Sequence, residues 1–313
     1  MTFDLLETEK NNPDTWNIDQ LPTDQMLAVM QREDEKVAGA VKQALPEIAA
    51  AVDMITDSMR SGGRLFYVGA GTSGRLGVLD AAECPPTFGT PPELVQALLA
   101  GGREAMFQAV EGAEDDAERG AADLRKVNLK SNDVVVGLAA SGRTPYVVGA
   151  LRYAKSYGCR TAAICCVRAA EMATHAEIFI YAPVGPEVIA GSTRLKAGTA
   201  QKMVLNMLST ATMIKLGKTY ANQMVDVKAT NAKLADRVKR IVRDTAQVED
   251  AVAEDAVRRA NGSAKTALVM LLGGISAEEA EGCLVKANGS VRLALEHVSQ
   301  AREKLPANVG EKS

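Results

Sequence analysis

Residues 64–74 read RLFYVGAGTSG, an apolar run that ends in a glycine-rich turn. The run predicts a buried strand over 64–68, and the residues beyond the turn predict a helix from about Gly74 to Ala82. Because the apolar residues of the strand do not alternate with polar ones, the pattern favours a parallel sheet that helices cover on both faces. This stretch therefore indicates an α/β fold.

The same alternation of strand and helix continues along the chain. A buried helix is expected over 194–216, where nearly every face of the helix is apolar. Two further helices are expected over 104–125 and 145–157. The remaining strands of the sheet are expected at 94–99, 133–138, 161–166 and 178–181.

The regions on either side of the sheet have different patterns. Residues 1 to about 30 are polar and contain two prolines, which predicts an extended arm. An apolar stripe from Val37 to Met59 predicts a helix that Pro46 kinks or divides in two. After about Lys228 the strand pattern stops, and Ser276 begins a capping box typical of a short helix. We expect an N-terminal arm and helix over 1–50, a sheet domain over 51–228 and a small all-helical region over 229–313.

The composition is that of an ordinary globular protein, with 313 residues, 47% hydrophobic and 24% charged, and a formal net charge of -3. This balance gives no support to nucleic acid or an anionic membrane surface as a partner. The first residues lack the pattern of a secretory signal, and no apolar stretch is long enough to span a bilayer. Five cysteines without a CxxC spacing, and only two histidines, argue against a disulfide framework or a zinc site. We therefore expect a cytoplasmic protein with reduced thiols and no metal.

The turn at 69–74 matches the GxGxxG pattern of dinucleotide-binding proteins. Such a site needs an acidic residue near the end of the second strand to hold the ribose. That strand ends Leu99-Ala100-Gly101-Gly102 and has no carboxylate before Glu104, which argues against a dinucleotide.

A second loop, residues 139–144 with the sequence AASGRT, also follows a strand and precedes a helix. Two such loops would bring backbone N–H groups, helix N-termini and hydroxyls to one edge of a parallel sheet, where they form an anion cradle. Neither loop has the lysine of a nucleoside-triphosphate loop, so a monophosphate fits better. The alternative is that both loops are tight turns whose Ser and Thr residues only cap the helices.

Further polar residues allow either a functional or a structural interpretation. Ser192 and Arg194 lie where the buried helix begins, and could bind the same anion or simply belong to a helix cap. The two histidines lie far from the loops in sequence, so proton transfer falls to carboxylates. Glu83 is the lone acid in an apolar, proline-stopped stretch, and Glu111 and Glu114 belong to an acidic run. The alternatives are a solvated helix end for Glu83 and a solvated face for the acidic run.

Taken together, these residues resemble the N-acetylmuramic acid 6-phosphate etherases over nearly the whole chain. The resemblance implies a sugar isomerase (SIS) domain with a parallel sheet, an N-terminal helical arm and a small helical tail similar to ubiquitin-associated domains. It also implies a homodimer that works in bacterial cell-wall recycling. The matching blocks are Thr8-Glu9, Asn12-Pro13, 69–75, 82–89, 109–115, 138–146, 185–187 and 191–202.

The family's activity implies that water cleaves the lactyl ether of N-acetylmuramic acid 6-phosphate, by loss of lactate and then addition of water. No metal, nicotinamide or other cofactor is required. By the family's pattern, Glu83 matches the proton donor to lactate and Glu114 matches the second acid–base residue. The residues that match substrate and phosphate binding are Gly71, Thr72, Ser73, Ser141, Gly142, Arg143, Thr144, Ser192 and Arg194.

One segment departs from the family. Where the family has a more polar, Asn-rich turn, this chain has Cys-Val-Arg-Ala-Ala at 166–170, which leaves the contacts of the loop 166–175 open. Two other functions remain as alternatives: a non-catalytic sugar-phosphate sensor, such as the related glucokinase regulator, and an aldose–ketose isomerase. Glu83 and Glu114 are both present, which favours the etherase.

Overall fold

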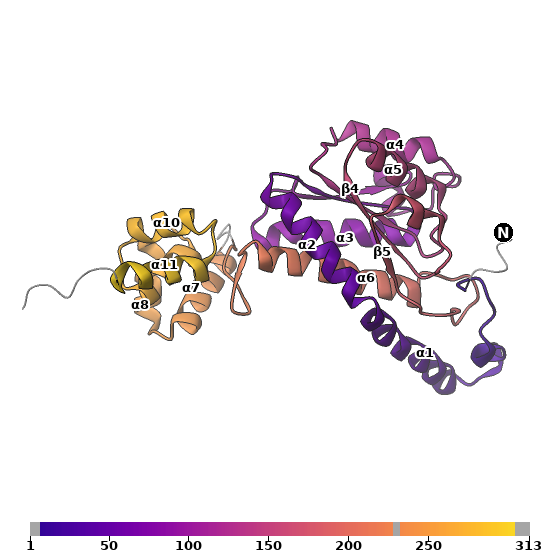
Figure 1. Cartoon of the computed structure of the whole chain (residues 1–313). Coiled ribbons are helices and arrows are strands. Elements are labelled where there is room, and N and C mark those ends of the chain that lie inside the picture. The colour runs from indigo at the N-terminus through magenta and orange to yellow at the C-terminus, as the bar shows by residue number, and fades with distance from the viewer. Residues whose placement is uncertain (1–6, 228–231, 304–313) are drawn as a thin grey trace, which may run out of the picture. The chain divides into compact units, whose positions relative to one another are not determined.

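The computed structural model describes residues 7–227 and 232–303, and these fall into two compact units (Figure 1). The first unit comprises Met1–Glu83 and Pro91–Thr212, and the second comprises Cys84–Thr90 and Met213–Ser313. The domain boundary expected between residues 228 and 229 lies in 228–231, outside the described residues.

The first unit is built on a five-stranded parallel sheet, as the sequence predicts. The spatial order of the strands is β2-β1-β3-β4-β5, so the chain reverses its direction of travel across the sheet after β2. The strand bounds are β1 Leu65–Gly69, β2 Val95–Leu99, β3 Val134–Leu138, β4 Arg160–Cys165 and β5 Ile178–Tyr181.

Helices cover both faces of this sheet (Figure 1). Helices α4 (Ala117–Lys126) and α5 (Pro145–Ser156) pack on the face that carries Phe66 and Val68. Helix α3 (Gly71–Phe88) lies on the opposite face, where Tyr67 donates a hydrogen bond to Asp80 of α3 over 3.0 Å. Helix α6 (Lys196–Lys215) contacts α3: the side-chain amide of Asn206 in α6 donates a hydrogen bond to Asp80 in α3 over 2.7 Å.

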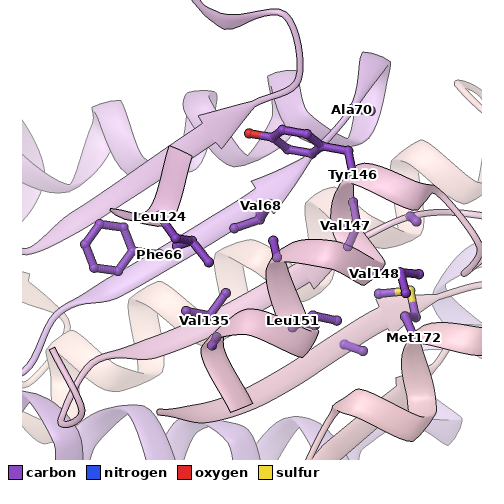
Figure 2. Close-up of a cluster of buried hydrophobic side chains, with 14 of the residues drawn as sticks. Phe66, Val68, Ala70, Leu124, Val135, Tyr146, Val147, Val148, Leu151 and Met172 are labelled. Atoms are coloured by element: carbon purple, nitrogen blue, oxygen red, sulfur yellow. The ribbon is translucent and has the colours of Figure 1, made fainter. Parts of the chain in front are cut away.

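The core under α4 and α5 is formed by apolar side chains from strands and helices far apart in the sequence (Figure 2). Phe66 and Val135 come from β1 and β3, whereas Leu124 comes from α4 and Leu151 from α5, and all four are fully buried. Full burial of each such side chain stabilises the fold by about 1.5–3 kcal/mol. This packing fixes α5 against β3, and with it the loop that joins them.

The N-terminal region contains more helix than the sequence predicts. Pro46 divides the predicted helix as expected, since α1 (Thr23–Gln43) ends before Ala44 and α2 (Leu45–Arg60) carries the proline in its first turn. The prediction of an extended arm over the first 30 residues is wrong in part, because α1 begins at Thr23. Its polar residues form the solvent face, while Val29, Glu33, Val37, Ala40 and Val41 form its buried stripe.

The helix expected over 104–125 is also wrong in part. The chain instead forms the short 3-10 helix η4 (Gly102–Met106) and then a loop, in which Gly112 has a φ of 70°. Helix α4 begins only after Asp116, whose side chain accepts a hydrogen bond from the Arg119 N–H over 2.9 Å. The acidic run is therefore a loop that leads to a helix cap.

The second unit contains a short antiparallel hairpin and then helices alone within the described residues. The capping box is confirmed: Ser276 caps α10, and Glu279 accepts a hydrogen bond from the Ser276 N–H. Helix α9 is buried on nearly every side and forms the centre of this unit. The bounds are β6 Thr219–Tyr220, β7 Gln223–Met224, α7 Ala232–Ala246, α8 Asp250–Arg259, α9 Ala264–Gly273, α10 Ala277–Lys286 and α11 Val291–Glu303.

Candidate active site

A cavity of about 360 Å³ opens at the carboxyl edge of the sheet, inside the first unit. Strands β1 and β3 are neighbours there, with Gly69 opposite Leu138, so the two predicted loops leave the sheet side by side. The cavity brings together most of the residues predicted to bind an anion. Those that line it are Gly71, Thr72, Ser73, Ser141, Arg143 and Thr144, together with the predicted acid–base residue Glu114.

The first loop is compact because two glycines let the strand and the helix approach closely. A Cβ on Gly74 would lie 2.4 Å from Leu99 Cδ1 and 2.6 Å from the Gly69 carbonyl oxygen. Helix α3 therefore begins almost directly at the sheet edge, and Gly71 takes a left-handed φ of 51°. The first N–H groups of a helix have no partner inside it, so here they are available to an anion.

Ser73 in this loop is held from behind by Gln201 of α6. The Ser73 hydroxyl and Gln201 Oε1 are 2.8 Å apart, and the two side chains are only 9% and 1% exposed. The Nε2 atom of Gln201 has no hydrogen-bond partner among the described residues. Rotation of the Gln201 side-chain amide by about 180° exchanges Oε1 and Nε2, so that Nε2 donates to Ser73 Oγ. The hydroxyl hydrogen of Ser73 is then free to bind an anion.

The second loop makes a tight turn against the segment that follows β4. Gly142 has a φ of 66°, and a Cβ there would lie 2.3 Å from Ala170 Cβ. The Gly142 carbonyl accepts a hydrogen bond from the Met172 N–H over 3.0 Å. The loop 166–175, whose contacts the sequence left open, is thus packed behind the second loop.

Thr144 precedes the first residue of α5, but its side chain makes no capping hydrogen bond within the described part of the chain. The interpretation of this threonine as a mere helix cap is therefore not supported. Thr144 lines the cavity together with Arg143, which carries a positive charge. Gly142 shapes the turn without lining the cavity.

The carboxylates Glu114 and Asp115 lie on the cavity wall. The Glu114 carbonyl accepts a hydrogen bond from the Tyr146 N–H over 2.9 Å, which ties the acidic loop to the first turn of α5. Tyr146 is fully buried and donates from its hydroxyl to Asp123 over 3.0 Å. Glu114 is thus an exposed side chain on an anchored backbone.

The segment just before α6 contributes Thr193 to the cavity, but Ser192 and Arg194 are not among the described lining residues. The backbone N–H groups of Lys196 and Ala197 donate to the buried Glu187 carboxylate, each over 2.9 Å. Burial raises the pKa of Glu187 although these two hydrogen bonds oppose the shift. A carboxylate of the chain itself therefore occupies this helix N-terminus.

The N-terminal segment reaches the cavity through Glu9. Thr15 donates from its hydroxyl to the Val188 carbonyl over 2.8 Å, and Tyr181 donates to Glu7 over 2.8 Å. Deeper in the unit, Lys196 pairs with Glu33 of α1 over 2.5 Å. Burial works to raise the pKa of Glu33, but hydrogen bonds from Lys196 and Lys36 outweigh it and leave the pKa lowered.

Four of the residues at or behind the site were not assigned a role from sequence. Glu9 and Thr193 lie in segments whose contacts depend on distant parts of the chain, and Asp115 is one of several adjacent acids. Gln201 did carry a signal, since it is a polar residue on a helix that is otherwise apolar on nearly every face.

The described residues contain no group of three or more histidine, cysteine or acidic side chains that could hold a metal ion. No described helix is long and apolar enough to cross a membrane. Burial raises the pKa of Cys165 to about 12, so this thiol stays protonated beside the second loop.

Comparison with known proteins places this geometry in a family. The family model of the glucokinase regulatory protein N-terminal SIS domain matches residues 47–155, and that of the SIS domain matches residues 113–211. The N-acetylmuramic acid 6-phosphate etherase of Mycolicibacterium smegmatis is 55% identical over 295 residues, which cover 94% of this chain and 99% of the relative. The etherase of Pasteurella multocida is 56% identical, over 93% of this chain and 96% of the relative.

This chain belongs to the N-acetylmuramic acid 6-phosphate etherase family. Among solved structures it is similar to a phosphoheptose isomerase from Neisseria gonorrhoeae, with a TM-score of 0.49 and 15% identity. That likeness covers 61% of this chain and 98% of the isomerase.

Glu83, the proton donor that the sequence analysis expects, does not lie at the cavity of the same chain. It is an exposed residue near the end of α3 and is not among the described residues that line the cavity. It follows Gly71 by about three turns, or roughly 18 Å along the helix axis at 1.5 Å per residue. The single chain thus brings Glu114 to the cavity and leaves Glu83 at a distance.

Proposed function

We propose that this chain uses water to cleave the D-lactyl ether of N-acetylmuramic acid 6-phosphate, which gives N-acetylglucosamine 6-phosphate and D-lactate. The observation that carries the proposal is a hydroxyl-rich cavity with Glu114 on its wall. The chain that forms it is 55% identical, over 94% of its length, to the N-acetylmuramic acid 6-phosphate etherase of Mycolicibacterium smegmatis. We expect the reaction in the cytoplasm, where the five cysteines stay reduced.

The two loops would hold the 6-phosphate. The first turn of α3 offers backbone N–H groups, and Thr72, Ser73, Ser141 and Thr144 offer hydroxyls. Arg143 supplies one guanidinium, a charge suited to a monophosphate. The same cradle would serve a sensor or an isomerase, so the phosphate site by itself does not select the reaction.

Carboxylates would carry the proton transfers. In the open-chain sugar the C2 proton is α to the aldehyde, and Glu114 would remove it as a general base. The C3–O bond then breaks, and lactate leaves with the bonding electrons and a proton from Glu83. Water adds to C3 of the unsaturated aldehyde and a proton returns to C2, so the sum of the two steps is hydrolysis of the ether.

We further propose that a homodimer completes this site. The distance along α3 keeps Glu83 of one chain away from its own cavity, so a Glu83 that protonates lactate would come from a second copy. In a symmetric dimer each chain offers the same surface, so the arrangement would supply both cavities at once. Its exposure leaves Glu83 accessible to such a partner.

The decisive experiment is to incubate the purified protein with N-acetylmuramic acid 6-phosphate and to assay D-lactate with a lactate dehydrogenase. We expect lactate and N-acetylglucosamine 6-phosphate in equal amounts. Saturable binding of the sugar phosphate without lactate would instead support a sensor. Conversion of an aldose phosphate into a ketose phosphate, again without lactate, would support an isomerase.

A further inference from the structure

A second cavity, of about 270 Å³, adjoins the first on the far side of Glu114. The two cavities share Ala70, Gly71 and Glu114, so the general base proposed above stands at their boundary. The wall of the second cavity consists mainly of alanine and glycine residues from the segments around β1, β2 and η4. Such small apolar residues leave room for a short branched substituent.

Arg75 is the one cation among the described residues that line this second cavity. Its Nε donates to the carbonyl oxygens of Ala105 and Met106 over 2.9 and 3.1 Å, which fixes the guanidinium in place. The hydrogen bonds that Arg75 makes to described residues all use Nε. Its two terminal nitrogens therefore remain available for a planar, two-pronged anion.

We propose that the second cavity receives the D-lactyl arm of the substrate and that Arg75 binds its carboxylate. The proposal rests on the proposed function, because the substrate then carries two anions on either side of the reacting carbons. With the phosphate on the loops and the C2 proton at Glu114, the arm on C3 extends across the boundary into the second cavity. Arginine matches a carboxylate with two parallel hydrogen bonds, and the alanine wall accepts the lactyl methyl group.

The lining also contains Glu111, whose carboxylate would repel that of the ligand. Glu111 is exposed, so water and salt screen its charge, whereas Arg75 is half-buried. The positive charge of Arg75 therefore outweighs the negative charge of Glu111, so this end of the site favours a negatively charged ligand group. A neutral side chain at position 75 should remove the preference for a charged arm and leave the phosphate site intact.

The test varies the protein and the ligand together. Arg75→Gln, Arg75→Lys and the exposed control Arg103→Gln are compared with the wild type on N-acetylmuramic acid 6-phosphate, on its lactyl amide and on N-acetylglucosamine 6-phosphate. Calorimetry with Glu114→Gln added to every protein measures binding without turnover. Arg75→Gln should bind the acid about 10- to 100-fold more weakly and the other two ligands within about twofold. Arg75→Lys should recover part of the loss, and Arg103→Gln should bind as the parent does.

Two results would overturn the proposal. One is that Arg75→Gln weakens the binding of all three ligands equally. Arg75 would then act only by holding η4 in place through its hydrogen bonds to Ala105 and Met106. The other is an unchanged preference of that variant for the acid over the amide. Lactate release by the wild type, measured alongside, tests the proposed function separately, since the preference for the acid can be measured even when no lactate forms.

Discussion

The two ends of helix α3 differ in how completely one chain builds them. At its beginning, Gly71, Thr72 and Ser73 line the cavity, and the buried Ser73 hydroxyl is held by Gln201 from another helix. Near its end, Glu83 is exposed and is not among the described residues that line the cavity. Between them, Asp80 accepts hydrogen bonds from Tyr67, Asn206 and Ser209 and fixes the helix in place.

The difference shows that one helix carries both a cavity-lining start and an exposed carboxylate away from that cavity. The beginning of α3 belongs to the proposed phosphate site, whose described lining comes from a single chain: the loops after β1 and β3, the acidic loop before α4, and Glu9 and Thr193. Near the end of α3, Glu83 would take part in the proposed reaction only when a second copy of the chain approaches it. Binding of the sugar phosphate and cleavage of the ether should therefore respond differently to changes along this helix.

The largest effect is expected at the far end of α3 and at the cavity wall. Glu83→Ala and Glu114→Ala should each lower lactate release by about 10²–10⁴-fold, because a positioned acid or base is lost. If Glu83 is only the acid, its variant should still exchange the C2 proton with solvent deuterium, whereas Glu114→Ala should not. NMR of the substrate in heavy water separates the two roles. Near-normal lactate release from Glu83→Ala would show that Glu83 is not the acid of the reaction.

Mixed dimers should show whether the two ends of α3 cooperate across chains. A heterodimer of Glu83→Ala and Glu114→Ala, purified through two different tags, should regain about half of the wild-type activity, since one cavity keeps both carboxylates. The matched control pairs a wild-type chain with the double variant. It should be inactive if the site is shared, and about half active if each chain works alone. Activity in the control but not in the first heterodimer would contradict the shared site.

A smaller effect is expected at the beginning of the helix. Ser73→Ala and Ser141→Ala should each weaken binding of N-acetylglucosamine 6-phosphate by about 1.5–3 kcal/mol, or about 10- to 150-fold, because a charge-assisted hydrogen bond is lost. Gln201→Met should reproduce part of the Ser73 effect, since Gln201 orients that hydroxyl. The exposed Ser156→Ala serves as the control. Unchanged affinities in calorimetry for both loop variants would show that the phosphate lies elsewhere.

The middle of the helix should affect stability and its pH dependence. Burial raises the pKa of Asp80 although hydrogen bonds from Asn206, Tyr67 and Ser209 oppose the shift. The folded pKa thus exceeds the unfolded one, so the stability that Asp80 contributes is present below about pH 3.9 and is lost as the pH rises through the folded pKa. Relative to Asp80→Asn, the wild type should lose free energy of unfolding across that window. Urea titrations between pH 3.5 and 6.5 measure this difference, and a constant or opposite trend would contradict it.

No effect is expected from removal of metal ions. The described residues offer carboxylates and hydroxyls around the cavity but no cluster with metal-ligand character. Lactate release after exhaustive treatment with EDTA should equal that of the untreated protein. Loss of activity that a divalent ion restores would show that carboxylates alone do not perform the chemistry at either end of α3.

Patterns within short segments predicted the secondary structure of this protein well. The apolar runs 64–68 and 133–138 form β1 and β3, and Pro46 separates α1 from α2 as expected. The sequence pattern failed where a helix needs a partner face that the local sequence does not reveal. Polar residues before Val29 concealed the start of α1, and the helix predicted over 104–125 contains Gly112, which has a left-handed φ of 70°.

Sequence alone determined the parallel sheet, the two glycine-rich turns and the hydroxyls on them, because these depend on continuous apolar runs and on backbone freedom within a few residues. Only the tertiary structure decided which residues meet. The pairing of β1 with β3 brings two loops together that lie far apart in the sequence, and α6 folds back to place Gln201 behind Ser73. The tertiary structure also separated Glu83 from Glu114. A helix advances about 1.5 Å per residue, so its later residues lie away from the site where it begins.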